Sequence, residues 1–367
     1  MINVLFVFRR KRTERLLLYK QGLGPDEMLY GMNHFFNNTQ FNVSFIEGDV
    51  GPSTLLRSLA KWMERIITKG FGMGFALDMM LENLPRLKSA DVIISTVDSC
   101  GLPIALLNRL GVIKAPLIYI SQGLSDRVEA LSRKPFLHHF YKTFYSWLLR
   151  SCENLLTLGE GAARHLLITL DLKGKEVKAV PFGVDMEFWR PADANAPVGD
   201  YILSVGSDSA RDYETLVRAI GNRKLKIVTR LPVNITDPSA RIEVRSDYSD
   251  VELRALFQGA RFLVTPLKDV TQPSGQSATL QAMACGKAII ITCTRGLWEP
   301  QYIKHLESAY LVAPGDTQSL ACAINDLEED PKLLNTISKN SLNLIRSRYN
   351  SEHFSKLLFN IVNEKKP

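Results

Sequence analysis

The sequence predicts an α/β protein made of two doubly wound, Rossmann-like domains. Twelve short runs rich in apolar and β-branched residues alternate with longer segments of helical periodicity, as in parallel sheets joined by crossover helices. A polar stretch rich in Pro and Ala, residues 191–200, divides these runs into two sets of six. The chain of 367 residues is long enough for two domains, and 46% apolar with 23% charged residues is a globular composition.

The first domain, residues 1–190, is expected to contribute six strands. Each is a short apolar run that ends before a polar or glycine-containing turn. These runs are residues 2–8, 41–46, 91–96, 116–121, 154–158 and 177–182. The second domain, residues 191–345, repeats the pattern at residues 201–205, 225–229, 241–244, 261–265, 288–292 and 309–312. Residues 346–367 show helical periodicity alone, so the chain is expected to end in a helix.

Composition argues against several classes of protein. Five cysteines are scattered without a CxxC pair, and the histidines lack metal-ligand spacing, so neither a disulfide framework nor a metal site is expected. No apolar run reaches the roughly 18 to 20 residues that span a bilayer. The N-terminal run 2–8 precedes the basic residues, which reverses the order of a secretory signal. A cytoplasmic protein is therefore expected.

The net charge of +7 is concentrated in the first half of the chain. Residues 1–190 contain 24 Lys+Arg against 18 Asp+Glu, whereas the rest of the chain contains 21 against 20. This bias favours anionic lipid, phosphorylated substrates or nucleic acid without choosing between them. Residues 53–69 predict an amphipathic helix in which Arg57, Lys61 and Arg65 recur at fourfold spacing, and such a helix could lie on an anionic membrane. A helix packed on the core, with solvated cations, explains the same pattern.

A polar loop that follows the expected strand 261–265 is the first candidate binding site. Residues 271–277 read TQPSGQS and lead directly into a helix of small residues. Open parallel sheets bind ligands beyond the carboxyl ends of their strands, where loops expose backbone N–H groups and helix N-termini. The loop therefore predicts a phosphate site, in which Gly275 would permit close approach. A helix start with a turn glycine is the alternative. The predicted amide donors are those of Ser274, Gly275, Gln276 and Ser277.

Residues 272–299, QPSGQSATLQAMACGKAIIITCTRGLWE, resemble the donor-binding segment of glycosyltransferase family 4, the group 1 glycosyltransferases. Three other stretches, VPFGVDMEFWRP, ILSVGSDSARDYETLVRAI and YLVAPGDTQSLACAI, resemble further motifs of this family. They follow the family's order at residues 180–191, 202–220 and 310–324. The resemblance covers the second half of the chain well and the first half loosely. It implies the GT-B fold, in which two Rossmann-like domains face a central cleft and the last helix returns to the first domain.

The resemblance also implies an activity. Members of the family transfer a sugar from a nucleoside diphosphate to an acceptor, with retention and without a required metal, and the nucleotide sugar serves as co-substrate with no further cofactor. The acceptor would be a glycan, a lipid-linked molecule or a small molecule, and nucleic acid is not expected as a partner. The basic first domain adds peripheral association with the inner face of the plasma membrane as an expectation.

Two other functions stay open on the same fold. A sugar-nucleotide epimerase would need acidic and histidine catalytic groups, which the motifs do not supply. A non-catalytic relative would bind a sugar nucleotide or a partner without turnover.

Matching the family's motifs residue by residue gives the donor-binding candidates. Gly206 lies in the phosphate segment, and Arg211 is the candidate cation, since a guanidinium binds two phosphate oxygens at once. Arg230 is a second candidate cation, although an ordinary surface charge explains either arginine. Glu299 follows the expected strand 288–292 in a loop that contacts the sugar in the family.

The sequence departs from the family at a pair of glutamates eight positions apart. Gln281 replaces the glutamate that holds the ribose, and its side chain can still hydrogen-bond a hydroxyl. Pro273 stands at the other position, with Gln272 as the nearest polar substitute. These departures favour the non-catalytic relative as the alternative.

Candidates on the acceptor side follow two strands of the first domain. Gln122 takes the place of a histidine that the family often has, and it cannot act as a general base because an amide does not titrate. Asp98 and Ser99 follow the expected strand 91–96. Asp98 is a candidate to bind the acceptor or to accept its proton, and a helix-capping Asp is the alternative.

Overall fold

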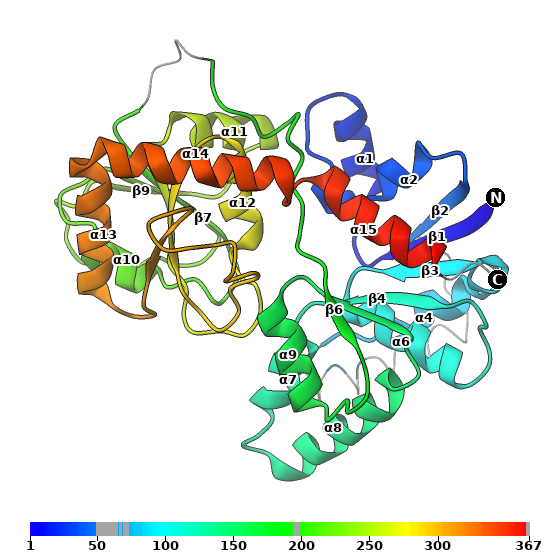
Figure 1. Cartoon of the computed structure of the whole chain (residues 1–367). Coiled ribbons are helices and arrows are strands. Elements are labelled where there is room, and N and C mark those ends of the chain that lie inside the picture. The colour runs from blue at the N-terminus through cyan, green and yellow to red at the C-terminus, as the bar shows by residue number, and fades with distance from the viewer. Residues whose placement is uncertain (49–64, 66–67, 69–72, 194–198, 365–367) are drawn as a thin grey trace. The chain divides into compact units, whose positions relative to one another are not determined.

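The computed structural model describes residues 1–48, 65, 68, 73–193 and 199–364, and the chain divides into two compact units (Figure 1). Unit 1 consists of Met1–Leu16, Met28–Pro181 and Ser355–Pro367, and unit 2 of Leu17–Glu27 and Phe182–Phe354. The chain passes from unit 1 to unit 2 after Pro181, and the short N-terminal segment Leu17–Glu27 also belongs to unit 2. The predicted amphipathic helix 53–69 lies outside the described residues, except at positions 65 and 68.

Unit 1 is built on a six-stranded parallel sheet with the order β2-β1-β3-β4-β5-β6. Its strands are β1 (Ile2–Phe8), β2 (Phe41–Glu47), β3 (Val92–Ser95), β4 (Leu117–Ser121), β5 (Asn154–Thr157) and β6 (Val177–Ala179). Strands β3 and β4 are buried along their whole length, which explains their continuous apolar sequence. The strand order reverses between β1 and β3, which pair in the register Val4↔Val92. This reversal is the switch point at which such sheets bind ligands.

Unit 2 contains a second six-stranded parallel sheet, with the order β12-β11-β10-β7-β8-β9. Its strands are β7 (Ile202–Val205), β8 (Leu225–Val228), β9 (Ile242–Arg245), β10 (Phe262–Thr265), β11 (Ala288–Thr292) and β12 (Tyr310–Val312). Here the order reverses between β7 and β10, which pair at Leu203↔Leu263. The predicted fold class is therefore confirmed. Strand β6 ends before Pro181 because proline cannot donate to a ladder.

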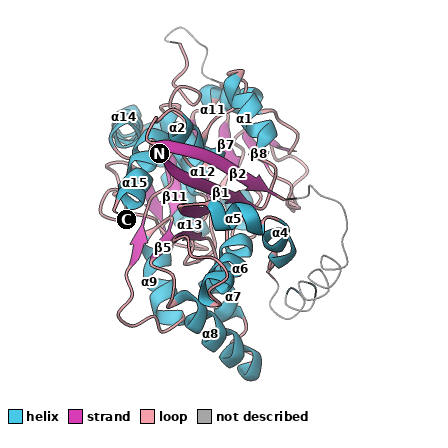
Figure 2. Ribbon diagram, turned by 90° about the vertical axis from the view of Figure 1, so that its right-hand side faces the viewer, coloured by secondary structure: helices cyan, strands magenta, loops and turns pink. Residues whose placement is uncertain are grey.

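Helices flank the strands of both sheets (Figure 2). The helices that begin in unit 1 are α1 (Thr13–Lys20), α2 (Met32–Phe36), α4 (Leu77–Glu82), α5 (Leu84–Ser89), α6 (Asp98–Arg109), α7 (Leu124–Ala130), α8 (Pro135–Leu149) and α9 (Glu160–Thr169). Those of unit 2 are α10 (Tyr213–Ala219), α11 (Asp250–Gly259), α12 (Gln276–Ala284), α13 (Thr317–Glu329) and α14 (Pro331–Ser347). A short 3-10 helix, η1, covers Glu27–Leu29. None of the described helices is both long and apolar enough to cross a bilayer.

The last helix, α15 (Ser351–Asn363), begins in unit 2 and continues into unit 1. Figure 1 shows it beside β1 and β2. Its Phe359 ring lies 4.2 Å from the Phe35 ring and 5.5 Å from the Phe41 ring, centroid to centroid. Aromatic packing of this kind stabilises the association of α15 with the sheet edge of unit 1.

Candidate functional site

The switch point of unit 2 joins the loops that follow β7 and β10. An isolated antiparallel bridge pairs Arg211 with Leu267, and the Lys268 amide donates to the Ala210 carbonyl at 2.8 Å. The two loops are thus held together at the carboxyl ends of neighbouring strands, where open sheets bind ligands. The bridge joins residues that are 56 positions apart in the sequence.

Arg211 is buried in this switch point with part of its hydrogen-bonding capacity unused. Its side chain is 3% exposed, and Nε donates to Asp208 Oδ2 at 2.9 Å. Its Nη1 is buried without a hydrogen-bond partner among the described residues. A buried donor left unpaired costs roughly 1 to 3 kcal/mol. A ligand that accepts from Nη1 would recover this free energy, so the arrangement points to an anion site.

Two glycines line the Arg211 guanidinium. A Cβ on Gly206 would overlap the guanidinium, and a Cβ on Gly275 would lie 3.1 Å from Nη1 and 2.5 Å from Thr265 Cγ2. The Tyr213 hydroxyl donates to the Gly206 carbonyl at 2.6 Å and holds this backbone in place. The predicted residues Gly206, Arg211 and Gly275 are therefore brought together, because only glycine leaves room for the cation.

Helix α12 begins at this point without a side-chain cap. Its N-cap is Gly275, in the left-handed conformation with φ +75°. The other described helices of unit 2 have caps in which a side chain accepts from the first turn, namely Asp212, Ser249, Asp316 and Asp330. An uncapped N-terminus keeps amide donors and partial positive charge for a ligand.

The loop before α12 uses part of its own donors. The Ser274 amide donates to the Gln272 carbonyl at 2.7 Å, and the Gln276 amide donates to the Pro273 carbonyl at 3.3 Å. These two amides close the turn, so of the four predicted amide donors those of Gly275 and Ser277 are left for a ligand. The Gln276 side chain is buried, whereas Gln272, Ser274 and Ser277 are half-buried.

Gln281 is buried against a carboxyl group that sequence reasoning missed. Its Nε2 donates to Glu27 Oε1 at 2.9 Å and to Ser277 Oγ at 3.3 Å. The same Glu27 oxygen accepts from Trp189 Nε1 at 2.8 Å, and the other accepts from the Asp185 amide at 3.3 Å. Burial outweighs these hydrogen bonds and raises the pKa of Glu27 to about 8.

The Glu27 contact gives a physical reason for glutamine at position 281. A glutamate there would place two carboxylates about as close as the observed 2.9 Å contact in a buried site, where like charges cannot both ionise. Because the Gln281 amide nitrogen donates to Glu27 and Ser277, its Oε1 is the atom left to accept from a ligand hydroxyl. Glu27 ends the segment QGLGPDE, residues 21–27, which resembles only loosely the glycine-rich turn that the family has near the donor phosphates.

Arg230 lies at the end of β8, next to the switch point. Its amide donates to Ser207 Oγ at 2.9 Å, which ties the carboxyl ends of β7 and β8 together, and its side chain is exposed. A cavity of 500 Å³ opens between the loops that follow β7, β8 and β10. Its lining includes Ser209, Arg211, Tyr213, Leu231, Pro232, Val233, Asn234 and Lys268. The site therefore combines the buried cation with an adjoining, partly apolar hollow.

Glu299 is placed differently from the expectation of a carboxylate that faces a sugar. Arg348 Nε donates to Glu299 Oε2 at 2.8 Å, and Arg348 Nη2 donates to Glu299 Oε1. The Arg348 guanidinium also lies 4.0 Å from the centroid of the Tyr302 ring. Both carboxylate oxygens are thus engaged in a bidentate ion pair that links the β11 loop to the end of α14.

The acceptor-side candidates gather at the carboxyl ends of β3 and β4 in unit 1. Asp98 Oδ1 accepts from the Tyr119 hydroxyl at 2.5 Å and from Ser121 Oγ at 2.7 Å, and Oδ2 accepts from the Gln122 amide at 3.1 Å. Burial raises the pKa of Asp98. The Gln122 side chain donates to the Thr96 carbonyl, and the Ser99 carbonyl accepts from the Ala76 amide. Both carboxylate oxygens of Asp98 therefore accept hydrogen bonds within the chain.

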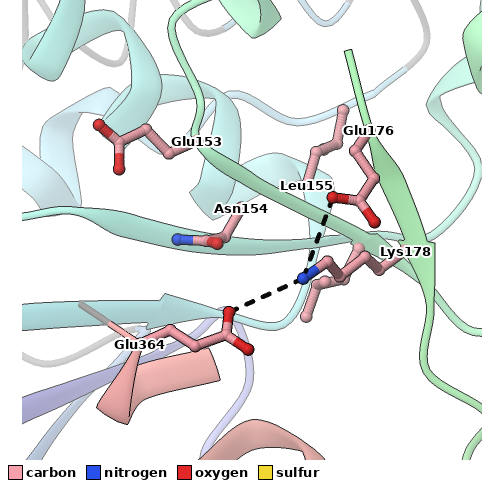
Figure 3. Close-up of a pocket in the computed structure, with 7 residues that line it drawn as sticks. Glu153, Asn154, Leu155, Glu176, Lys178 and Glu364 are labelled. Carbon is pink, nitrogen blue, oxygen red and sulfur yellow. Dashed lines mark ion pairs between the residues drawn. The ribbon is translucent and has the colours of Figure 1, made fainter. Parts of the chain in front are cut away.

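Two other polar clusters lie in unit 1. Figure 3 shows a pocket of 320 Å³ at the amino-terminal ends of β5 and β6, where Lys178 pairs with Glu176 at 4.0 Å and Glu364 at 3.8 Å. This is the end of the sheet opposite to the one that binds ligands in such folds. His165, for which no metal-ligand spacing was found in the sequence, lies between Asp126 and Glu129, 3.3 and 3.0 Å from their oxygens.

Comparison with known proteins gives the following similarities. Residues 207–343, which include the switch-point cation and helix α12, match the family model "Glycosyl transferases group 1". No curated protein sequence matches the chain.

Solved structures resemble the whole chain at low identity. Sucrose-phosphate synthase from Thermosynechococcus elongatus has a TM-score of 0.68 at 15% identity over 99% of both chains. HepE from Anabaena in complex with UDP-glucose has a TM-score of 0.66 at 12% identity, over 99% of this chain and 100% of that one. The N-terminal domain of trehalose-6-phosphate phosphatase from Candida albicans reaches 0.70 at 13% identity, over 99% and 97%. The family match confirms the predicted resemblance, and the structures confirm the fold.

Proposed function

We propose that this chain, whose residues 207–343 match the group 1 glycosyltransferase family, transfers a sugar from a nucleoside diphosphate bound at the switch point of unit 2. One observation carries the proposal. Arg211 is almost fully buried beside two glycines and an uncapped helix N-terminus, yet its Nη1 has no hydrogen-bond partner among the described residues. This is the environment that a phosphate oxygen would complete.

The diphosphate is the part of the donor that this site suits best. As the bond from the sugar to the phosphate breaks, negative charge grows on the departing oxygen. Hydrogen-bond donors that already point at this oxygen before the bond breaks lower the barrier, because they need no reorganisation during the reaction. Arg211 Nη1 and the amides of Gly275 and Ser277 would act in this way.

The nucleoside would extend from the phosphates toward polar and apolar groups of unit 2. Gln281 Oε1 is left to accept from a ribose hydroxyl, since Glu27 accepts from the amide nitrogen. The cavity beside Arg211 offers Leu231 and Pro232 to a planar base. The UDP-glucose bound to HepE, a protein of the same fold, supports a nucleotide sugar as the ligand.

The chemistry that the family resemblance supports is transfer with retention and without a required metal. The bond from sugar C1 to the phosphate oxygen breaks, and a bond from C1 to the acceptor oxygen forms on the same face. The acceptor's proton passes to a phosphate oxygen of the leaving diphosphate. Gln122 cannot take that proton because an amide does not titrate. The acceptor would be a glycan, a lipid-linked molecule or a small molecule.

A panel of UDP-, GDP- and ADP-sugars tests the proposal. A bound donor should raise the melting temperature of the purified protein by mass action, and the matching donor should release free nucleotide with turnover. Neither stabilisation nor turnover with any donor of the panel would overturn the proposal.

A non-catalytic sugar-nucleotide binder is the second candidate function. Two observations on the carboxylates expected to contact the sugar favour this function. Pro273 replaces one glutamate of the family pair, and the Glu299 carboxylate is paired with Arg348. Stabilisation by a nucleotide sugar without nucleotide release, with a range of acceptors supplied, would select this function over transfer.

A further inference from the structure

Helix α8 carries a row of four aromatic side chains, of which three are exposed and one, Phe144, is half-buried against the core. Phe136, Phe140, Phe144 and Trp147 recur at spacings of three and four residues, so they share one face of the helix. We call these four residues the aromatic stripe. Phe136 is 82% exposed, Phe140 54% and Trp147 39%. The opposite face packs in the unit 1 core through residues that include Tyr141, Tyr145 and Leu148.

The rings of the aromatic stripe are ordered against one another. Phe140 and Phe144 are stacked with an interplanar angle of 3° and centroids 6.3 Å apart, and Phe144 lies 6.1 Å from Trp147. The Arg109 guanidinium lies 5.1 Å from the centroid of Trp147. Large aromatic side chains grouped on a surface are unfavourable in water and mark a site of interaction.

The charges around the aromatic stripe identify the surface that would cover it. Residues 131–150 contain four cations and no Asp or Glu. Arg133 and Lys134 precede the helix and are exposed, whereas Lys142 lies within it and Arg150 follows it. Cations at both ends of an aromatic helix face match the interface of an anionic bilayer, where rings lie among the headgroups and Lys or Arg contact lipid phosphates.

We propose that α8 docks unit 1 on an anionic membrane surface, with the aromatic stripe inserted at headgroup level and the flanking cations against the lipid phosphates. This inference goes beyond the proposed transfer and does not depend on the donor site, since it is built from α8 alone. It is also separate from the predicted helix 53–69, which lies outside the described residues.

Vesicle sedimentation of the full chain tests the proposal. The probe is phosphatidylcholine vesicles with and without phosphatidylglycerol. The wild-type protein should sediment with the anionic vesicles, and added salt should weaken the binding. The double variant Phe136→Ser/Phe140→Ser should bind them at least about tenfold more weakly. Its melting temperature should stay unchanged because both side chains are exposed.

Two further variants make the test specific. Arg133→Gln/Lys134→Gln should weaken binding to the anionic vesicles by roughly tenfold and leave the stripe intact. Ile235→Ser, which removes an exposed apolar residue of unit 2, should change nothing.

Three results would overturn the proposal. The first is undiminished sedimentation of the Phe136→Ser/Phe140→Ser variant, which would place any membrane contact elsewhere. The second is equal binding of the wild type to vesicles with and without phosphatidylglycerol. The third is a wild-type dimer, seen by analytical ultracentrifugation, that this variant dissociates, because the stripe would then cover a second copy of the chain.

Discussion

The two sheets have similar switch points but use their buried charges in opposite ways. In unit 1, Asp98 follows β3, and both of its oxygens accept hydrogen bonds from side chains and backbone of β4 and its loop. In unit 2, Arg211 follows β7, and it keeps Nη1 without a partner among the described residues. A buried polar group that is saturated stabilises the fold, whereas one with spare capacity is stabilised by a ligand. From this comparison we propose that Arg211 binds a ligand and that Asp98 has a structural role.

Replacement of Arg211 should give the largest loss of activity. In Arg211→Ala, we expect sugar transfer or donor hydrolysis to fall by roughly 100-fold or more, because a preorganised charge at the leaving group is lost. The fold should survive, since the partner Asp208 is 42% exposed and can be rehydrated. Nucleotide release measures the rate, and thermal unfolding monitors the fold.

Arg218→Ala is the matched control for this prediction. Arg218 also pairs with a carboxylate in unit 2, that of Glu214, but its side chain is 60% exposed. It should retain wild-type activity, as expected for an exposed ion pair. Activity of Arg211→Ala within twofold of this control would contradict the assignment of the buried cation.

Replacement of Asp98 should act on stability more than on turnover. Asp98→Ala leaves Tyr119, Ser121 and the Gln122 amide without their acceptor, so we expect a loss of about 3 kcal/mol in the free energy of unfolding. Asp91→Ala, which removes an exposed carboxylate that accepts from the Asn3 amide, should cost much less.

A second variant at this position, Asp98→Asn, can contradict the comparison between the two switch points. A role for Asp98 as proton acceptor predicts that kcat falls in Asp98→Asn, which keeps most of the hydrogen bonds. A large fall in kcat at unchanged melting temperature would show that Asp98 takes part in the reaction.

We expect Glu27 to make the stability of unit 2 depend on pH. Its folded pKa of about 8 lies above the ordinary value of 4.5, so the folded state holds a proton that the unfolded state releases between these values. The free energy of unfolding should therefore fall as pH rises from 4.5 to about 8, by at most roughly 1.4 kcal/mol per pH unit. Chemical unfolding at several pH values should show a flatter profile for Glu27→Gln.

Gln281→Glu should steepen this pH dependence. A second carboxyl group next to Glu27 can be accommodated only while the pair holds protons, so we expect destabilisation by about 2 kcal/mol at pH 8 and little at pH 5. The exchange Glu27→Gln/Gln281→Glu, with one carboxyl group in the pair, should restore much of the stability. A double variant no more stable than Gln281→Glu would show that the two side chains are not coupled.

The features that could be predicted from the sequence are those that short, continuous stretches of sequence encode. Strand runs such as 2–8 and 288–292 are visible because burial on both faces leaves a continuous apolar run. The meeting of Arg211 with Gly275 could also be predicted, since both follow parallel strands whose carboxyl ends share one edge.

Contacts between distant segments could not be predicted in the same way. The hydrogen bond between Glu27 and Gln281 spans 254 residues, and it depends on an N-terminal segment that crosses into unit 2. The ion pair of Glu299 with Arg348 and the contact of His165 with Asp126 likewise join separate elements. Neither periodicity nor motif spacing indicates which of several carboxylates a given donor side chain will contact in the fold.

The smallest expected effect is a difference in stability between two glycine variants. It separates the cost of the backbone conformation at Gly275 from the cost of the close contacts that a Cβ would make there. Gly275→Ala and Gly315→Ala replace glycines with nearly equal φ angles, +75° and +71°, so both should lose about 1 kcal/mol of stability to backbone strain. At Gly315 the new Cβ meets nothing within 4 Å, whereas at Gly275 it would lie 2.5 Å from Thr265 Cγ2 and 3.1 Å from Arg211 Nη1. Gly275→Ala should therefore lose about 1 to 2 kcal/mol more in chemical unfolding. It should also weaken the thermal stabilisation by nucleotide, which Gly315→Ala should leave intact. Equal losses of stability in the two variants would mean that the Thr265 and Arg211 side chains move away from the new Cβ at little cost. The Arg211 site would then not be rigid, which contradicts the proposal of a preorganised donor site.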